Sequence, residues 1–204
     1  MSYQEWISLI TPSTIQGSGP GATLNTATTA TLSPVTGGTA DVAQVNVEGA
    51  FQGWQAGMLI RVTARGYITS TTTSTTVTFL LAARVGNTGT TYVTLATSAG
   101  LATSSATAQT GNPWKLEALI RCTNVATSGN TVATQGEMWV SQNPATAQTL
   151  NTGSAGVNLY LPSASGETNA AVDTTQIQGI SLRGTLAGAN ATVVCTQWLV
   201  EALN

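Results

Sequence analysis

The stretch that decides the fold is Trp114–Val125, which reads W-K-L-E-A-L-I-R-C-T-N-V. From Trp114 to Cys122 every second residue is apolar, and the residues between them are mostly charged or polar. Successive side chains of a β-strand point to opposite faces, so this period of two predicts a long strand with one buried face and one wetted face. Turn-forming pairs, Asn112-Pro113 before the stretch and Gly129-Asn130 after it, are expected to bound the strand.

The same period of two recurs along the rest of the chain. Residues 58–65 alternate between apolar and polar side chains, and Gly66 after them predicts a bulge or the close approach of another backbone. Gly179 likewise predicts a bulge. Further strands are expected over residues 42–47, with a turn at 49–51, and over residues 76–85, 91–96, 132–141, 156–161, 175–186 and 191–203. Small polar residues predict loops over residues 69–76, 100–111 and 163–173.

This succession of strands, with no helical pattern between them, predicts an all-β fold. The sequence predicts eight to ten strands separated by turns, and this number fits an antiparallel, jelly-roll-like β-sandwich. We assign residues 41–204 to this domain. The closing stretch, 191–203, is largely apolar on both faces, so it is expected in the centre of a sheet or at a contact between subunits.

Residues 1–40 differ in character from the domain that follows. Prolines and the run G-S-G-P-G at 17–21 exclude long regular elements there. One interpretation is an extended N-terminal arm, and the other is a first edge strand followed by loose loops. In the first interpretation the tip of the arm carries an apolar anchor made of Trp6, Ile7 and Ile10.

The surface predicted for this chain is nearly uncharged. Only 7% of its 204 residues are charged, against about 25% in ordinary soluble domains, and the net charge is −2. Thr, Ala, Gly, Ser and Asn take the place of charged residues, so the surface lacks the charge that keeps free monomers apart. This composition favours a body that lies packed against copies of itself or against a larger assembly.

The distribution of charge and hydropathy excludes several classes of partner. The six basic residues are scattered singly, which argues against nucleic-acid binding. No apolar run approaches the roughly 20 residues of a membrane span, so no membrane partner is expected. The first residues show no basic n-region or apolar h-region, so no signal peptide is expected and the protein should stay in the compartment where it is made.

The sequence holds few residues that could carry chemistry. Histidine, the commonest general base and metal ligand, is absent. Cys122 and Cys195 lie far apart without CxxC spacing, so they are expected to be small buried hydrophobes, although a bridge between them stays open. No serine stands in G-x-S-x-G, and the glycine run at 17–21 is not a P-loop. We therefore expect a non-enzymatic protein that needs no cofactor and no metal.

Two groups of residues are candidates for a contact surface. Lys115, Glu117 and Arg121 share one face of the predicted strand, either as an ion-paired contact to a neighbouring subunit or as a wetted sheet face whose pairs contribute little. The tryptophans at strand positions either line a platform for a sugar or fill the core and an interface, and packing is favoured: Trp54, Trp114, Trp139 and Trp198. Of these, Trp198 in the closing strand is assigned to an interface.

Four blocks in order along the chain resemble a known group of proteins. They are G-M-L-I-R-V-T-A-R-G at 57–66, T-V-T-F-L-L at 76–81, N-P-W-K-L-E-A-L-I-R-C-T at 112–123 and G-N-T-V-A-T-Q-G at 129–136. This order resembles small β-sandwich virion proteins of tailed bacteriophages, in which two such strands and a Thr/Ser hairpin recur. The resemblance covers residues 50–140.

The resemblance implies a jelly-roll-like domain displayed on a phage particle, often as a homotrimer. It implies a capsid decoration or minor capsid protein, made in the host cytoplasm, that binds the major capsid protein on the head surface and stabilises the head. The alternative is a tail-fibre or tail-tip receptor-binding module that touches a host surface sugar with its loops. No catalytic residue is implied in either case.

Overall fold

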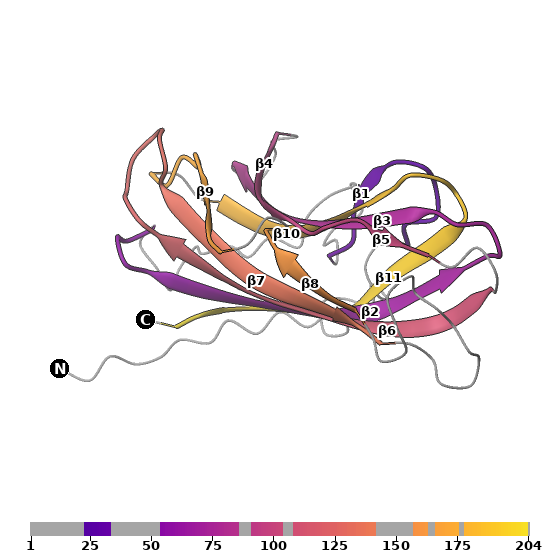
Figure 1. Ribbon diagram of the computed structural model, residues 1–204. Coiled ribbons are helices and arrows are strands. Elements are labelled where there is room, and N and C mark those ends of the chain that lie inside the picture. Colours follow the sequence, from indigo (N-terminus) through magenta and orange to yellow (C-terminus); the bar gives the residue numbers. More distant parts are fainter. Residues whose placement is uncertain are drawn as a thin grey trace, which may run out of the picture.

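The computed structural model describes residues 23–33, 54–85, 91–103, 108–141, 157–162, 166–175 and 178–203. Within these residues every regular element is a β-strand. The strands form two antiparallel sheets that pack face to face, and the molecule is elongated along them (Figure 1). The predicted all-β sandwich is therefore confirmed.

The two sheets differ in size and both combine strands that are distant in the chain. The five-stranded sheet has the order β1 (Thr29–Thr31), β10 (Gln178–Leu186), β3 (Thr76–Val85) and β4 (Tyr92–Thr97), with β5 (Leu101–Ala102) also paired to β3. The six-stranded sheet has the order β11 (Ala191–Ala202), β2 (Leu59–Ser70), β6 (Gln109–Cys122), β7 (Val132–Val140) and β8 (Val157–Leu161), with β9 (Thr168–Ala170) also paired to β7. The chain thus crosses between the layers repeatedly.

Alternation along β6 and β2 places the core as the sequence predicts. The apolar positions of β6 from Trp114 to Cys122 are at most 3% exposed, and the residues between them face outward. In β2 the apolar positions from Ile60 to Ala64 are buried and their neighbours Arg61 and Arg65 are exposed. Side chains of both sheets join in one core cluster, so the two layers share a single hydrophobic interior.

Gly66 marks the close approach of another backbone, as predicted. A Cβ atom at this position would lie 1.8 Å from the carbonyl oxygen of Val194 and 2.6 Å from the nearest ring carbon of Trp114. The register of β11 against β2 shifts between Cys195 and Gln197, so the irregularity lies on the partner strand. The bulge predicted at Gly179 is wrong, because Gly179 pairs with Arg84 in an unbroken register.

Two of the predicted loops contain strands. The segment 100–111 includes β5 and the first residues of β6, which continues straight through Asn112-Pro113. Pro113 lies opposite Tyr67 and its carbonyl accepts a hydrogen bond of 2.8 Å from the amide of Ser141, so the proline is accommodated within the sheet. The segment 163–173 contains β9. These short pairings depend on contacts with distant strands, which local turn signals do not report.

Part of the predicted N-terminal arm belongs to the sandwich. Leu24 and Val193 exchange backbone hydrogen bonds of 3.0 and 2.9 Å, and β1 pairs with β10. Leu24 and Leu32 are 1% and 0% exposed and lie in the core. The residues of the proposed anchor, Trp6, Ile7 and Ile10, lie outside the described residues, as do the strand predicted over 42–47 and its turn, so these remain predictions.

The closing strand β11 lies at the edge of the six-stranded sheet as described, and its predicted place in the centre of a sheet is wrong. Its apolar character on both faces has a local cause: the register shift between Cys195 and Gln197 reverses which positions point inward. Val193 and Cys195 before the shift and Trp198 and Val200 after it therefore all face the core. Trp198 is 0% exposed. The interface assigned to it is therefore corrected to a core position, since the side chain has no surface to offer a neighbour.

Candidate functional site

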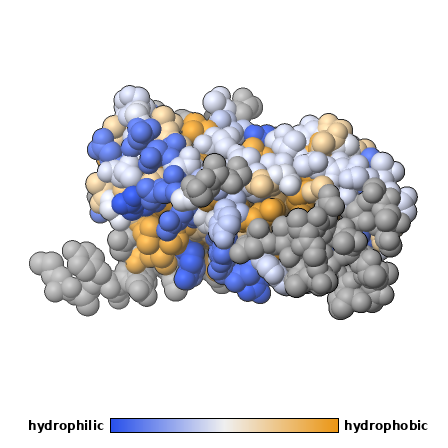
Figure 2. Space-filling view, viewed as in Figure 1, coloured by the Kyte–Doolittle hydropathy of each residue, from blue (hydrophilic) through white to orange (hydrophobic). Residues whose placement is uncertain are grey.

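The outward side chains of the six-stranded sheet form the surface on which charged residues gather, and we call it the charged face. It comprises Arg61, Arg65, Lys115, Glu117, Leu119, Arg121, Gln135, Glu137, Trp139, Tyr160, Glu201 and the adjoining loop residue Glu167. Four of the six basic and four of the eight acidic residues of the chain lie here. Figure 2 shows strongly hydrophilic residues beside an apolar patch on the left and lower side of the molecule, whereas its right-hand end is paler.

Lys115, Glu117 and Arg121 lie on this face together, at the positions that the period of two predicts. Lys115 Nζ lies 2.5 Å from Glu117 Oε1 on the same strand. Arg121 Nη2 donates to both carboxylate oxygens of Glu167, at 2.9 and 3.0 Å. These ion pairs form within the chain and are substantially exposed, so each stabilises the fold by no more than about 1 kcal/mol. A contact of these residues with a neighbouring subunit stays a prediction.

A further ion pair lies at the outer strand of the face. Arg61 Nε on β2 donates a hydrogen bond of 2.6 Å to Glu201 Oε2 on β11. The hydrogen bond and the charge of Glu201 raise the pKa of the Arg61 guanidinium above its usual value, and burial opposes the shift. Glu201 is only 8% exposed, so Arg61 compensates a carboxylate that is otherwise nearly buried.

Glu117 and Glu137 stand directly opposite each other on β6 and β7. Like charges at facing positions of an antiparallel pair repel each other, and a nearby cation relieves this repulsion. Lys115 supplies positive charge beside Glu117. The centre of the charged face therefore presents two exposed glutamates, with the basic residues of β2 and β6 on the side of Glu117 and Tyr160 on the side of Glu137.

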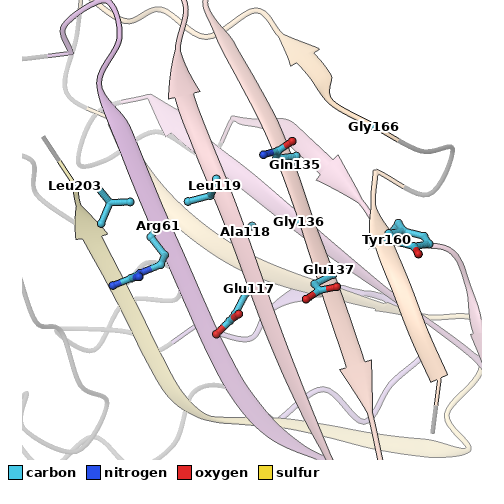
Figure 3. A pocket seen from close by; sticks show the side chains of 10 residues that line it. All are labelled: Arg61, Glu117, Ala118, Leu119, Gln135, Gly136, Glu137, Tyr160, Gly166 and Leu203. Carbon is cyan, nitrogen blue, oxygen red and sulfur yellow. The ribbon is translucent and has the colours of Figure 1, made fainter.

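Two hollows open on this face, and both are lined by the facing glutamates. The larger one, of about 540 Å³, is lined by Arg61, Glu117, Ala118, Leu119, Gln135, Gly136, Glu137, Tyr160, Gly166 and Leu203. Figure 3 shows these side chains carried by neighbouring strands, with Arg61 and Leu203 on one side and Tyr160 on the other. The smaller one, of about 290 Å³, lies among Lys115, Glu117, Glu137 and Trp139. The two hollows adjoin at Glu117 and Glu137, which line both, and we call the pair of hollows the depression.

Trp139 and Tyr160 expose large aromatic surfaces at this depression. Trp139 is 46% exposed and Tyr160 is 60% exposed, on the neighbouring strands β7 and β8. The other three tryptophans singled out from the sequence, Trp54, Trp114 and Trp198, are buried in the core. The preference for packing is thus confirmed for three of the four, whereas for the exposed Trp139 the choice between an interface and a sugar platform stays a prediction.

Sequence reasoning missed Glu137, Tyr160 and the hollows. A signal for Trp139 and Glu137 is present, because Gln135, Glu137 and Trp139 share one face of the strand predicted over 132–141. Tyr160 carries no such signal, since its strand is short and its place beside β7 follows from tertiary pairing.

The two cysteines are free and buried, so the bridge left open between them does not form. Cys122 lies on β6 and Cys195 on β11, with β2 between these strands. Burial raises the pKa of both thiols, that of Cys195 to about 12, while hydrogen bonding with the backbone opposes the shift. The expectation of two small buried hydrophobes is confirmed.

Comparison of the chain with protein-family models, with curated proteins and with solved structures gave no match. No helix in the described part of the chain is long and apolar enough to cross a bilayer.

Proposed function

We propose that this chain is a non-enzymatic structural protein of a tailed-phage virion that decorates the head, where it binds the major capsid protein and stabilises the shell. The sequence blocks at 57–66 and 112–123 support this proposal through their resemblance to small virion proteins. The observation that carries it is the charged face, which gathers most of the charge and two exposed aromatic side chains on one sheet of a sandwich with few other charges.

The chemistry of the charged face suits adhesion between proteins. Tyrosine, tryptophan and arginine are enriched at the energetic centres of protein interfaces, and this face offers all three. Complementary charge on the capsid would orient the bound protein, while the aromatic side chains contribute most of the affinity. Each bound copy that bridges neighbouring capsomers stabilises the shell by mass action, and a homotrimer would strengthen the attachment through multivalency.

Mapping the protein on intact virions tests the location. Immunogold labelling should place the protein on heads. In particles that lack the protein, the heads should break at a lower temperature than in complete particles. Labels only on tail ends, or none on the particle, would contradict the decoration role.

Binding to purified capsids tests which surface makes the contact. A chain with Glu117→Lys and Glu137→Lys should bind capsids at least about tenfold more weakly, because facing lysines reverse the central charge of the charged face. Thr94→Lys, at an exposed position on the other sheet, is the matched control and should bind as the wild type does. Equal binding by both variants would show that the charged face does not contact the capsid.

Truncation tests the arm as a clamp on the capsid lattice. The deletion should remove residues 1–20 only, because a deletion to residue 40 would also take Leu24 and Leu32 from the core. Capsid binding that survives this deletion would exclude the clamp while leaving the decoration role intact.

The alternative, a tail-fibre or tail-tip receptor-binding module, is favoured by one observation, the exposed pair Trp139 and Tyr160 beside a hollow. If the alternative holds, the immunogold label lies at the tail ends. Particles that lack the protein then keep stable heads but adsorb poorly to cells.

A further inference from the structure

We infer that the depression on the charged face, between Tyr160 and Trp139, is a binding site for a neutral carbohydrate. This goes beyond head decoration, because a stabilising protein needs no small ligand, and it uses the same exposed rings, so a sugar and the capsid would compete for this face. The larger hollow has a volume of about 540 Å³, within the roughly 300–1,000 Å³ range of small-molecule sites. Its lining combines three aliphatic residues with two carboxylates, a guanidinium, an amide and a phenol.

The two aromatic rings supply the apolar half of a sugar site. A pyranose presents one face of C–H bonds with partial positive charge, and the face of an aromatic ring carries partial negative charge, so the two stack favourably. Tyr160 lies opposite Glu137, and Trp139 lies two residues along β7 from it, so the aromatic side chains flank the same carboxylate. A ring left 46% or 60% exposed on a folded protein has a large face to offer.

The polar residues that line the two hollows match the hydroxyl groups of a sugar. Each sugar hydroxyl both donates and accepts, so it needs a mixed set of partners. Glu117 and Glu137 accept, the Gln135 amide does both, and the Tyr160 hydroxyl can donate. Hydrogen bonds to a carboxylate are the stronger kind, so the facing glutamates would contribute orientation as well as affinity.

Charge balance favours a neutral ligand. The charged face holds four basic and four acidic residues, and three ion pairs form among them. A phosphate or sulfate group would meet the two glutamates of the hollow, and a basic segment would meet Arg61 and Lys115 beside them. A polyol carries no charge, so neither the glutamates nor the basic residues repel it.

Titration of the full-length chain with oligosaccharides tests the inference. The probes are gluco-, galacto-, manno- and chito-oligosaccharides of two to four residues, observed by saturation-transfer NMR and quantified by calorimetry, with a trilysine peptide as the competing ligand. At least one oligosaccharide should bind, and Trp139→Ala and Tyr160→Ala should each weaken it about tenfold, which corresponds to about 1.4 kcal/mol. Trp139→Phe should retain most of the affinity because it keeps an aromatic face.

Tyr67→Ala is the matched control. Tyr67 is 38% exposed on β2 of the same sheet, outside the lining of either hollow, so its loss should leave the affinity unchanged. The three positions tested carry solvent-exposed rings, and unchanged thermal unfolding would show that each of the four variants folds. The inference is overturned if no oligosaccharide binds, if Tyr67→Ala weakens binding as much as Trp139→Ala, or if only trilysine binds. None of these results depends on where the protein lies on a virion, so the decoration role is tested separately.

Discussion

At the scale of single residues, Gly66 shows how closely the six-stranded sheet is packed. It lies where the carbonyl of Val194 and the ring of Trp114 leave no room for a side chain. Gly66→Ala should therefore lower the free energy of unfolding by about 3 kcal/mol, the upper part of the range for overpacked cores. Urea denaturation measures this change. Arg65→Ala, an exposed neighbour on the same strand, should stay within about 0.5 kcal/mol of the wild type, and equal effects would refute the steric explanation.

The thiol of Cys195 should make stability fall in alkaline solution. Burial raises its pKa from 9.0 to about 12 in the folded chain. Below pH 9 both states keep the proton, so the contribution is fully present there. Between pH 9 and 12 only the unfolded chain releases the proton, and the free energy of unfolding falls by about 1.4 kcal/mol per pH unit. Cys195→Ala should show a shallower fall over this range in urea denaturation; parallel pH profiles would contradict the assignment.

At the scale of elements, β1 and the residues before it behave as part of the sandwich. Leu24 and Leu32 contribute fully buried side chains from a segment whose composition predicts an arm. Leu24→Ala and Leu32→Ala should each lower the free energy of unfolding by about 2–5 kcal/mol, the cost of a cavity left by a buried leucine. Asn25→Ala, at an exposed position between them, is the control and should change little. Small effects at both leucines would mean that this segment is dispensable to the core.

At the scale of the whole molecule, the single core cluster couples the two sheets. Side chains of β3 and β10 from one layer and of β2, β6 and β11 from the other belong to it. We expect one cooperative unfolding transition, with equal calorimetric and van't Hoff enthalpies for the monomeric unit. Differential scanning calorimetry with a near-ultraviolet circular dichroism probe checks this. Two resolved transitions would show that the layers unfold separately.

The period of two determined much of this protein without any tertiary information. It placed β2, β3, β6, β7 and β11 within a few residues of their bounds and assigned the buried positions of β2 and β6, because one wetted and one buried face impose alternation on a strand. It also placed Lys115, Glu117 and Arg121 on a common face. Gly66 was predicted as a close approach because only glycine leaves room for a neighbouring backbone.

Only the tertiary structure decided which strands are neighbours, and that pairing creates the site. Strand order depends on contacts between residues far apart in the chain, such as β11 against β2, and no local pattern encodes them. The facing of Glu117 and Glu137, the place of Tyr160 beside them, and the hollow that they line follow from the register of β6, β7 and β8. Burial of Trp198 at an edge strand and of Leu24 outside any long strand likewise depends on how the two layers close on each other.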